Sequence, residues 1–492
     1  MGAELTTIVL SVICAYLGVL TVIGYIGYRK TKPTPEDYFL ASRTLGLFVL
    51  SMTMIATYAS MWTFLGAVGG NYRIGLSFLS MMMMWNLLWP ITLWLFGPRV
   101  WLLGRAYKYI TYSELINDYY ESRFLGVIAA AVGILALIPY IAVQLIGGGL
   151  ALEAFTKGGI PYAVGVTLMF VIMVIYVLIG GLRSVVWTDV IQGVFFLSAM
   201  FGMAMYAVYL LGGFGNMFSS IASTTPKLLK PGAIGFGMWI GYVFTWGIAV
   251  LLPHMFQRML MAKSPRTIGR TAASLSILSG WIQTVPVFIL GIACTLLIPG
   301  LTGKATDAAT ALFAGKFLDP WLGAAIIAAA FAAGMSTLDS QLLTASSILV
   351  RDGYVNPFNK KLPPEKETLL GRLVIIGLGI IIEIFALMRP GLIVPISTAG
   401  TAICISSYLY PLIGATLWRR AGKLAAYGSI ISAAVTAIVT WLVLPFPLGI
   451  YNVLWGLIIG GIVFIILSLI GKPPSPEKQE KFHGLLSKVF SY

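Results

Sequence analysis

The chain has 492 residues, of which 59% are hydrophobic and 10% are charged, whereas a soluble globular protein carries about 25% charged residues. This composition indicates an integral membrane protein. The long unbroken apolar runs exclude the alternating pattern of a membrane β-barrel, so the spans are expected to be helices. Three cysteines, Cys14, Cys294 and Cys404, lie singly in apolar segments and suggest neither a disulfide framework nor a metal cluster.

Apolar stretches of about 20 residues predict thirteen spans and therefore an all-α polytopic membrane protein. The first run, Thr6 to Tyr28, is too long for a signal-peptide core and lacks a small-residue cleavage site, so it is interpreted as a true span. The predicted spans begin near Thr6, Leu45, Leu76, Phe124, Ile160, Val186, Ala233, Thr271, Trp321, Arg372, Gly391, Leu424 and Tyr451.

The net charge of +15 comes from 32 Lys and Arg residues against 17 Asp and Glu residues. Twenty-five of those 32 follow the odd-numbered spans, and seven lie on the other side. This asymmetry is the positive-inside pattern, which predicts an amino terminus outside the plasma membrane and a carboxyl terminus in the cytoplasm. The basic charge therefore orients the chain among lipids and does not indicate nucleic acid binding.

The loops between the spans are short, so residues 1–492 are expected to form a single membrane domain. The tail, residues 471–492, is basic and partly apolar. A solvated tail is the favoured interpretation, and contact with anionic lipid is the alternative.

The stretch from Phe331 to Ser347 reads FAAGMSTLDSQLLTASS inside an apolar span. At 100° per residue five of its six hydroxyl side chains fall on one stripe with Ala333, and Asp339 lies on the flank of that stripe. Neutral oxygens on one face suit a monovalent cation such as sodium, but serine and threonine also serve helix packing. The stripe alone does not distinguish an ion-binding site from a packing interface between helices. Its hydroxyl residues are Ser336, Thr337, Ser340, Thr344 and Ser347.

Two other spans carry signs of interruption. The span from Leu45 mixes hydroxyl and small residues and ends in a glycine-rich segment, and the span from Ala233 contains Gly241, Gly247 and Pro253. Broken helices expose backbone carbonyls to ions and helix termini to solutes in transporters built from inverted repeats. Because the two weakened spans lie five spans apart, they predict two inverted five-helix repeats.

Four sequence elements resemble the sodium:solute symporter family, and the resemblance extends over nearly the whole chain. It implies a LeuT-like core of ten helices within thirteen. The protein is expected to function as a monomer. The expected divisions are 1–44 (first helix and loop), 45–212 and 233–418 (the two repeats), 419–470 (two further helices) and the tail. The matching elements are GGLRSVVWTDVIQG (Gly180 to Gly193), GMSTLDSQLL (Gly334 to Leu343), YFLASRTLG (Tyr38 to Gly46) and LPHMFQR (Leu252 to Arg258).

The resemblance implies where the sodium ion binds. Carried over motif by motif, the family's common site falls on the carbonyls of two residues in the broken second span and on a carbonyl and two hydroxyls in the ninth. These residues are Ala56, Ala59, Ala333, Ser336 and Thr337. A second sodium site, present in some relatives, corresponds to Asp189, Asp339 and Ser340. Those relatives lack an aspartate at the position of Asp339, so its protonation or pairing with an arginine competes with this interpretation.

The solute cavity is expected beside the sodium site, and Trp246 occupies the position of the family's aromatic gate. Candidate solute-binding residues are Thr57, Tyr58, Ser60, Trp62, Met84, Trp85, Asn86, Gln144, Trp246, Ser397 and Thr401. The proline carriers have an aspartate where this chain has Tyr58, which argues against proline. The segments ATYAS, VQLIGGG and LPH resemble the pantothenate carriers most, then the monocarboxylate carriers.

The predicted function is import of a small organic solute, pantothenate or a related monocarboxylate, by sodium-coupled alternating access. An amino-acid or sugar symporter of the same family is one alternative. A channel or passive facilitator is the rival class, although no repeated pore loop is visible. A membrane sensor lacks a cytoplasmic signalling domain, and a membrane enzyme lacks a catalytic constellation, since only two histidines are present.

Overall fold

The computed structural model describes residues 2–29 and 40–490, with the side chains at 2, 3, 27, 28, 42, 176, 179–184 and 364 left out. Within these residues the protein is helical, and the one β-type pairing is an isolated bridge between Leu45 and Ala262. Two residues of the expected YFLASRTLG element, Tyr38 and Phe39, lie outside the described residues. The all-α architecture predicted from composition is confirmed.

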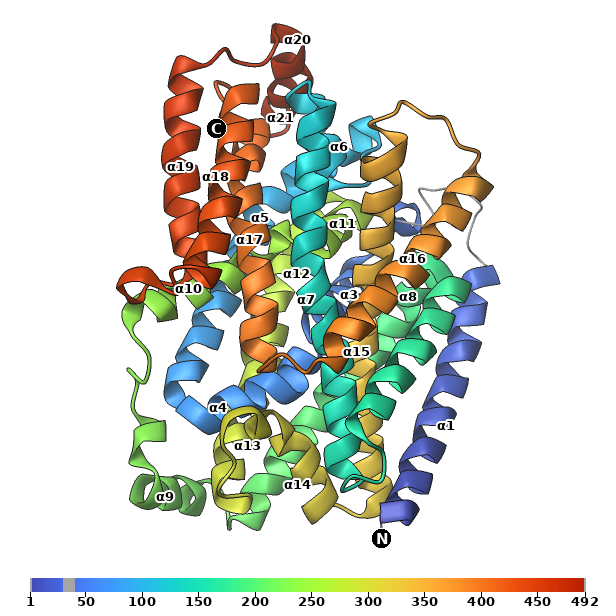
Figure 1. Cartoon of the computed structure of the whole chain (residues 1–492), viewed down its shortest axis with the longest axis vertical. Coiled ribbons are helices and arrows are strands. Elements are labelled where there is room, and N and C mark those ends of the chain that lie inside the picture. Colours follow the sequence, from blue (N-terminus) through green and yellow to red (C-terminus); the bar gives the residue numbers. More distant parts are fainter. Residues whose placement is uncertain (1, 30–39, 491–492) are drawn as a thin grey trace.

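The helices follow the apolar runs of the sequence and are separated by short connections (Figure 1). Their bounds are α1 Gly2–Arg29, η1 Ala41–Arg43, α3 Leu47–Tyr58, η2 Trp62–Ala67, α4 Val68–Ile74, α5 Leu76–Tyr107, α6 Tyr112–Tyr119, α7 Arg123–Phe155, α8 Tyr162–Leu210, α9 Phe214–Thr224, η3 Pro226–Leu229, α10 Phe236–Gly247, η4 Ala249–Leu251, α11 Pro253–Met261, α12 Pro265–Ile277, η5 Leu278–Gln283, α13 Thr284–Leu297, η6 Gly303–Ala308, α14 Ala309–Phe317, α15 Pro320–Ser347, η7 Ile348–Val355, α16 Pro364–Leu387, α17 Ile393–Thr416, α18 Lys423–Leu442, η8 Pro447–Gly449, α19 Asn452–Ile470, α20 Pro476–Gln479, η9 Glu480–Gly484 and α21 Leu485–Ser487.

Ten helices in the described part of the chain are long and apolar enough to cross a membrane, or eleven if α3 and the bent η2–α4 segment form one span. The sequence predicts thirteen, so that number is approximate. The difference lies in the first half of α8 and in the α10–α11 pair, whose continuous helical pieces are shorter than a full span.

The long element α8 comprises two antiparallel halves. Met169 in its first half packs against Gly334 of α15, and Gly193 in its second half packs against Ala56 of α3. The carbonyl of Ala56 is in turn hydrogen-bonded by Ser336, which lies only two residues after Gly334. Because a straight helix would separate Met169 from Gly193 by about 36 Å, α8 must double back. The predicted fifth and sixth spans are these two halves.

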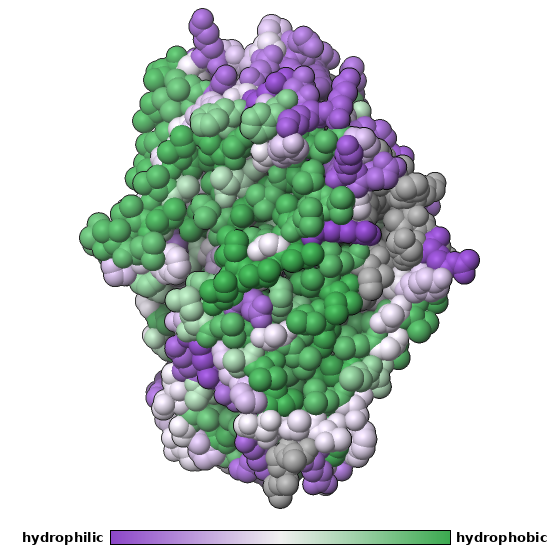
Figure 2. All heavy atoms as spheres, turned by 45° about the vertical axis from the view of Figure 1, so that its right-hand side comes forward, coloured by the Kyte–Doolittle hydropathy of each residue, from purple (hydrophilic) through white to green (hydrophobic). Residues whose placement is uncertain are grey.

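The surface shows the distribution expected of a membrane protein. Hydrophobic residues cover the middle of the face shown in Figure 2, and hydrophilic residues gather at its two ends. One end carries α9 and α14 together with the start of α1, and the other carries α6, α20 and α21 (Figure 1). Helix α15 runs through the interior and packs against α1, α7 and α8. The hydroxyl stripe is therefore deep inside the protein.

Both spans that the sequence marks as weak are interrupted. Helix α3 ends at Tyr58, Ala59 is extended with φ −78° and ψ 123°, and the helical path resumes at an angle of 63°. In the second span, α10 ends at Gly247 and α11 starts at Pro253. Proline lacks an N–H and forces the residue before it out of helical geometry, and Leu252 accordingly has ψ 135°.

The carboxyl-terminal tail is not solvated along its helical part, so that expectation is wrong. Lys478 and Lys481 both form ion pairs with Asp118 of α6. The ring of Phe482 packs between Tyr107 and Tyr119, with centroid distances of 6.0 and 5.0 Å. Alternating basic and apolar residues here face a partner within the same chain, and composition cannot distinguish such a partner from water.

His483 completes the docking of the tail. Its Nε2 atom lies 2.9 Å from the Tyr119 hydroxyl and 3.0 Å from the Gly414 carbonyl of α17. Burial lowers the pKa of His483 to about 4. Burial opposes the ionisation of Asp118, but hydrogen bonds from Lys478, Lys481 and Tyr109 outweigh that effect and lower its pKa. The tail therefore bridges α6 and α17 through an ionised aspartate and a neutral histidine.

Candidate functional site

The break after α3 meets the hydroxyl stripe of α15. The Ser336 hydroxyl donates to the Ala56 carbonyl at 2.8 Å and lies 3.1 Å from the Ala333 carbonyl. Oγ1 of Thr337 lies 3.2 Å from the Ala59 carbonyl and 3.3 Å from the Ala333 carbonyl. All five residues predicted for the common sodium site are therefore brought together.

This cluster has more acceptors than protons. The Thr337 hydroxyl also lies 3.0 Å from the carbonyl of Thr57, so four carbonyl oxygens surround two hydroxyls. Each hydroxyl has one proton to donate, and no carboxylate belongs to the set. Converging neutral oxygens in a buried place suit a monovalent cation, which interacts with several carbonyl dipoles at once. The donor set fits sodium.

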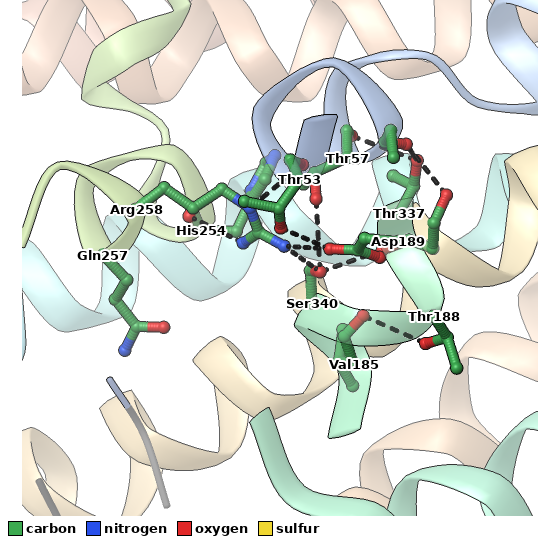
Figure 3. A network of polar contacts seen from close by, with 12 residues as sticks. Thr53, Thr57, Val185, Thr188, Asp189, His254, Gln257, Arg258, Thr337 and Ser340 are labelled. Atoms are coloured by element: carbon green, nitrogen blue, oxygen red, sulfur yellow. Dashed lines mark hydrogen bonds and ion pairs between the residues drawn. The ribbon is translucent and has the colours of Figure 1, made fainter. Parts of the chain in front are cut away.

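A buried ion pair lies on the same face of α15, one turn further along (Figure 3). Nη2 of Arg258, from α11, lies 3.2 Å from Asp189 of α8 and donates to the Ser340 hydroxyl at 2.5 Å. The Thr53 hydroxyl also donates to Asp189. Two of the three residues predicted for a second sodium site are thus bonded to a guanidinium.

Asp339, the third of those residues, does not join them. Both of its carboxyl oxygens are buried, and neither has a hydrogen-bond partner among the described residues. The predicted pairing of Asp339 with an arginine is absent from these described contacts, and the nearby guanidinium pairs with Asp189 instead.

Aromatic rings fill the space beside the break. Trp62 lies 5.2 Å from Trp246 and 5.6 Å from Trp85, measured between ring centroids. Tyr140 meets Trp246 edge to face at 5.6 Å, and Tyr58 approaches the same indole at 6.1 Å. The predicted residues Tyr58, Trp62 and Trp246 are therefore neighbours in one aromatic cluster, contributed by α3, η2 and α10.

Several predicted solute-binding residues carry polar atoms that the protein leaves unpaired. The indole Nε1 atoms of Trp62 and Trp246 and the hydroxyl of Thr401 are buried without a partner among the described residues. Native proteins pair the great majority of such atoms, so each exception calls for an explanation. The two indole N–H groups can donate to acceptors of a solute, such as carboxylate or carbonyl oxygens.

Other predicted solute ligands are already engaged by the chain. Asn86 donates to Thr284 at 2.9 Å and accepts from Ser279 at 2.5 Å. Gln144 accepts the N–H of Met61 at 3.0 Å and donates to the Tyr140 carbonyl at 3.2 Å. In this conformation each amide makes two of the four hydrogen bonds that its group can form, so one N–H and one oxygen lone pair of each are not used by these contacts.

The hydroxyl residues divide in the same way. Ser60 accepts the N–H of Trp62 at 3.1 Å, and Ser397 lies 3.0 Å from the Val394 carbonyl. The Thr57 hydroxyl lies 3.4 Å from that of Ser340. The Ser60 hydroxyl thus caps a helical segment, that of Thr57 bridges to α15, and that of Ser397 bonds back to its own helix, in contrast to the unpaired hydroxyl of Thr401.

Neighbouring positions of α5 face different environments. Met84 is 43% exposed and points out of the bundle, whereas Trp85 is buried in the aromatic cluster. Met84 therefore does not lie in the aromatic cluster with the other predicted solute-binding residues.

Sequence reasoning missed some contributors to the site. The carbonyl of Thr57 joins the oxygen cluster, and Tyr140 and Trp89 pack on the aromatic residues. Gln283 reaches the break by donating to Thr63 at 3.0 Å. A polar residue in an apolar span signals Gln283, but the tyrosine and the tryptophan resemble ordinary core residues.

The broken span is clamped at its far end, where α4 meets η6. Arg73 donates to Asp307 at 3.2 Å, and the other oxygen of Asp307 accepts the N–H of Ile393 at the start of α17. Burial raises the pKa of Asp307, an effect that Arg73 opposes. These contacts join α4, η6 and α17.

Comparison with known proteins identifies relatives along nearly the full length of the chain. Residues 38–435 match the model of the sodium:solute symporter family. A sodium/pantothenate symporter of Escherichia coli (strain K12) is 27% identical over 471 residues, covering 93% of this chain and 95% of the relative. A sodium/proline symporter of the same organism is also 27% identical, over 497 residues that cover 97% and 96% of the two chains.

Solved structures agree on the fold. A sodium-coupled sialic acid symporter, described in a substrate-bound outward-open state, superposes with a TM-score of 0.80 at 20% identity and covers 95% of this chain and 98% of its own. The transporter MhsT in complex with L-phenylalanine gives a TM-score of 0.55 at 14% identity, over 85% and 98% of the two chains. The arrangement of helices is therefore that of LeuT-fold sodium symporters.

Proposed function

Since this chain belongs to the sodium:solute symporter family, we propose that the solute it carries is pantothenate or a related monocarboxylate. Sodium-coupled symport is the activity of the family, sodium is the coupling ion, and the relatives are transporters rather than enzymes. The relative named as a sodium/pantothenate symporter supports the choice of solute. The unpaired indole N–H groups of Trp62 and Trp246 support it as well, because they can donate to a carboxylate.

The observation that carries the proposal is the oxygen cluster between α3 and α15. The sodium ion binds there, with the carbonyls of three residues and the two hydroxyls as ligands. The carbonyl of Thr57 is a further candidate ligand. The carbonyl ligands are Ala56, Ala59 and Ala333, and the hydroxyl ligands are Ser336 and Thr337.

A second sodium site at Asp189, Asp339 and Ser340 remains a prediction. In this conformation Arg258 supplies the positive charge that Asp189 requires and also occupies the Ser340 hydroxyl. One bound sodium ion is therefore the simplest proposal for this state.

Sodium couples to the solute by stabilising one conformation. An ion at the cluster joins α15 to the broken span and thereby favours the state in which the solute cavity is formed. Each sodium ion that enters contributes about 2.3 kcal/mol per 100 mV of membrane potential. The moving parts are the two proposed repeats, residues 45–212 and 233–418, and the chain works as a monomer.

The proposed orientation follows from the distribution of basic residues. The end with α9 faces outward and the end with α6 and the tail faces the cytoplasm of a plasma-membrane protein, with lipid around the apolar belt. In oriented right-side-out vesicles, external trypsin is expected to leave the tail intact. Cleavage of the tail by external trypsin would reverse the assignment.

Proline is the second candidate, because a sodium/proline symporter is equally identical to this chain. The resemblance to proline carriers fails at Tyr58, whose ring stacks on Trp89 with centroids 4.2 Å apart. The hydroxyl-bearing ring offers no carboxylate for the amino group of proline, so carboxylates without an amino group, such as pantothenate, are favoured.

Reconstituted vesicles test the choice of solute and the coupling together. Uptake of labelled pantothenate, lactate, pyruvate and proline is measured with an inward sodium gradient and with choline in its place. We expect pantothenate or a monocarboxylate to accumulate only with sodium. Preferred uptake of proline would contradict the proposed solute. Uptake that does not depend on sodium would contradict the proposed sodium coupling.

A further inference from the structure

The peptide group between Ala59 and Ser60 makes one contact through its carbonyl and another through its N–H. Its carbonyl, from Ala59, faces Thr337 at 3.2 Å in the oxygen cluster. Its N–H, from Ser60, points to Oγ1 of Thr63 at 3.4 Å. Because a trans peptide is planar and its N–H and C=O point in opposite directions, a partner that holds the N–H also sets the direction of the carbonyl.

Thr63 and Ser60 cap the helical segment that follows the break. The Ser60 hydroxyl accepts the N–H of Trp62, two residues on, and the Thr63 hydroxyl reaches back to the N–H of Ser60. This arrangement resembles a capping box, but Ser60 accepts from the second residue after it rather than the third, and threonine takes the place of the usual Glu or Gln. The short threonine side chain brings the capping oxygen close to the backbone of the break.

Gln283 fixes that threonine from a different span. Its Nε2 atom donates to Oγ1 of Thr63 at 3.0 Å. Gln283 and Thr63 are 2% and 1% exposed, so water does not compete with the bond. Gln283 is the last residue of η5, and Thr63 lies in η2; both are π-helical turns, a geometry that recurs at functional sites.

We propose that Thr63 and Gln283 are positioning residues for sodium, acting through the Ala59–Ser60 peptide to aim the Ala59 carbonyl at the ion. Gln283 holds the Thr63 hydroxyl, that hydroxyl holds the Ser60 N–H, and the peptide plane transmits the orientation to the carbonyl. Neither side chain touches the ion. The inference rests on the sodium site proposed above and adds a second layer of residues that tune its affinity.

The chain offers near-isosteric variants that separate positioning from packing. Thr63→Val removes the hydroxyl at nearly constant volume, and Thr63→Ser keeps it. Gln283→Met removes the donor and retains a long unbranched side chain. Equilibrium binding of radioactive sodium to the purified protein is measured for each variant, together with its melting temperature and with the Ser336→Ala/Thr337→Ala variant as a reference.

We expect Thr63→Val and Gln283→Met each to raise the sodium concentration for half-saturation about three- to tenfold, the effect of one lost hydrogen bond. Thr63→Ser is expected to bind as the original protein does. The Thr63→Val/Gln283→Met double variant is expected to be no weaker than Thr63→Val alone, because the glutamine acts through the threonine.

Unchanged half-saturation in a folded Thr63→Val variant would overturn the inference while leaving the sodium site in place, provided that the Ser336→Ala/Thr337→Ala reference loses binding. Additive effects in the double variant would show that Gln283 acts by another route. Absence of saturable sodium binding to the original protein would remove the proposed site and this inference with it.

Discussion

At the scale of single residues, the guanidinium of Arg258 is a buried charge near the site that depends on one partner. Its side chain is 1% exposed, and the carboxylate it contacts, Asp189, is fully buried. Transfer of two such charges from water is costly, and their attraction offsets that cost only while both partners remain. The pair also determines which face of α15 meets α11, since Arg258 holds Ser340.

Removal of one partner is therefore expected to destabilise the fold. Asp189→Asn leaves Arg258 as an uncompensated buried charge, which costs about 3–5 kcal/mol. Glu153→Gln breaks a half-exposed pair with Arg389 and is expected to cost less than about 1 kcal/mol. The melting temperatures of the two variants are measured by thermal unfolding in detergent. Equal melting temperatures for Asp189→Asn and Glu153→Gln would contradict the stabilising role of the buried ion pair.

The sequence identifies the ligands of the proposed sodium site better than their supports. Ser336 and Thr337 stand in a recognisable element, and the structure places them against Ala56 and Ala59 as that resemblance implies. The hydrogen bond from Gln283 to Thr63 joins residues 220 positions apart. No local pattern encodes such a pair, because it exists only once two spans have packed together.

At the scale of elements, helix breaks are predictable and docking partners are not. Gly247 and Pro253 mark the interruption between α10 and α11 in the sequence itself. The docking of η9 against α6 depends on Asp118 and on Tyr119, which lie more than 350 residues away from the tail. The tail therefore looks solvated in sequence and is packed in the structure.

Loss of the Asp118 charge is expected to release the tail. Asp118→Asn removes the common partner of Lys478 and Lys481, so trypsin should cleave after these lysines faster than in the original protein. Glu480→Gln is the matched control, since that side chain is 72% exposed and lies 4.0 Å from Lys488. Equal cleavage of the two variants would show that the ion pairs do not retain the tail.

Acid is expected to weaken docking through His483. Docking lowers the pKa of this histidine to about 4 from an ordinary value of about 6.5, so the released tail binds more protons between these values. The contribution of His483 to the free energy of docking is therefore complete above about pH 6.5. It decreases as the pH falls from about 6.5 to about 4, by at most about 1.4 kcal/mol per pH unit.

A spin label at Val489→Cys, with the exposed Cys14 replaced by serine, reports on this equilibrium. Label mobility should rise between pH 7.5 and pH 5, and His483→Gln should abolish that dependence. Mobility that is independent of pH in the original protein would contradict the role of His483.

At the scale of the whole molecule, composition and apolar runs predict the architecture because the bilayer permits few solutions. Every backbone polar group in lipid must be paired within the chain, so a long apolar chain becomes a helix bundle. Hydropathy alone does not determine the number of spans. The reversal inside α8 and the short pieces α10 and α11 depend on packing that hydropathy does not record.

The central claim is that one ion site joins the broken span to α15 and drives transport. Equilibrium binding of radioactive sodium tests it most directly, with Thr337→Ser as the control that keeps a hydroxyl. We expect saturable binding in the original protein. In Ser336→Ala/Thr337→Ala the half-saturating concentration should rise about tenfold or more, the equivalent of ~1.4 kcal/mol. If the double variant binds sodium with the same half-saturating concentration as the original protein, the proposed ion site is wrong.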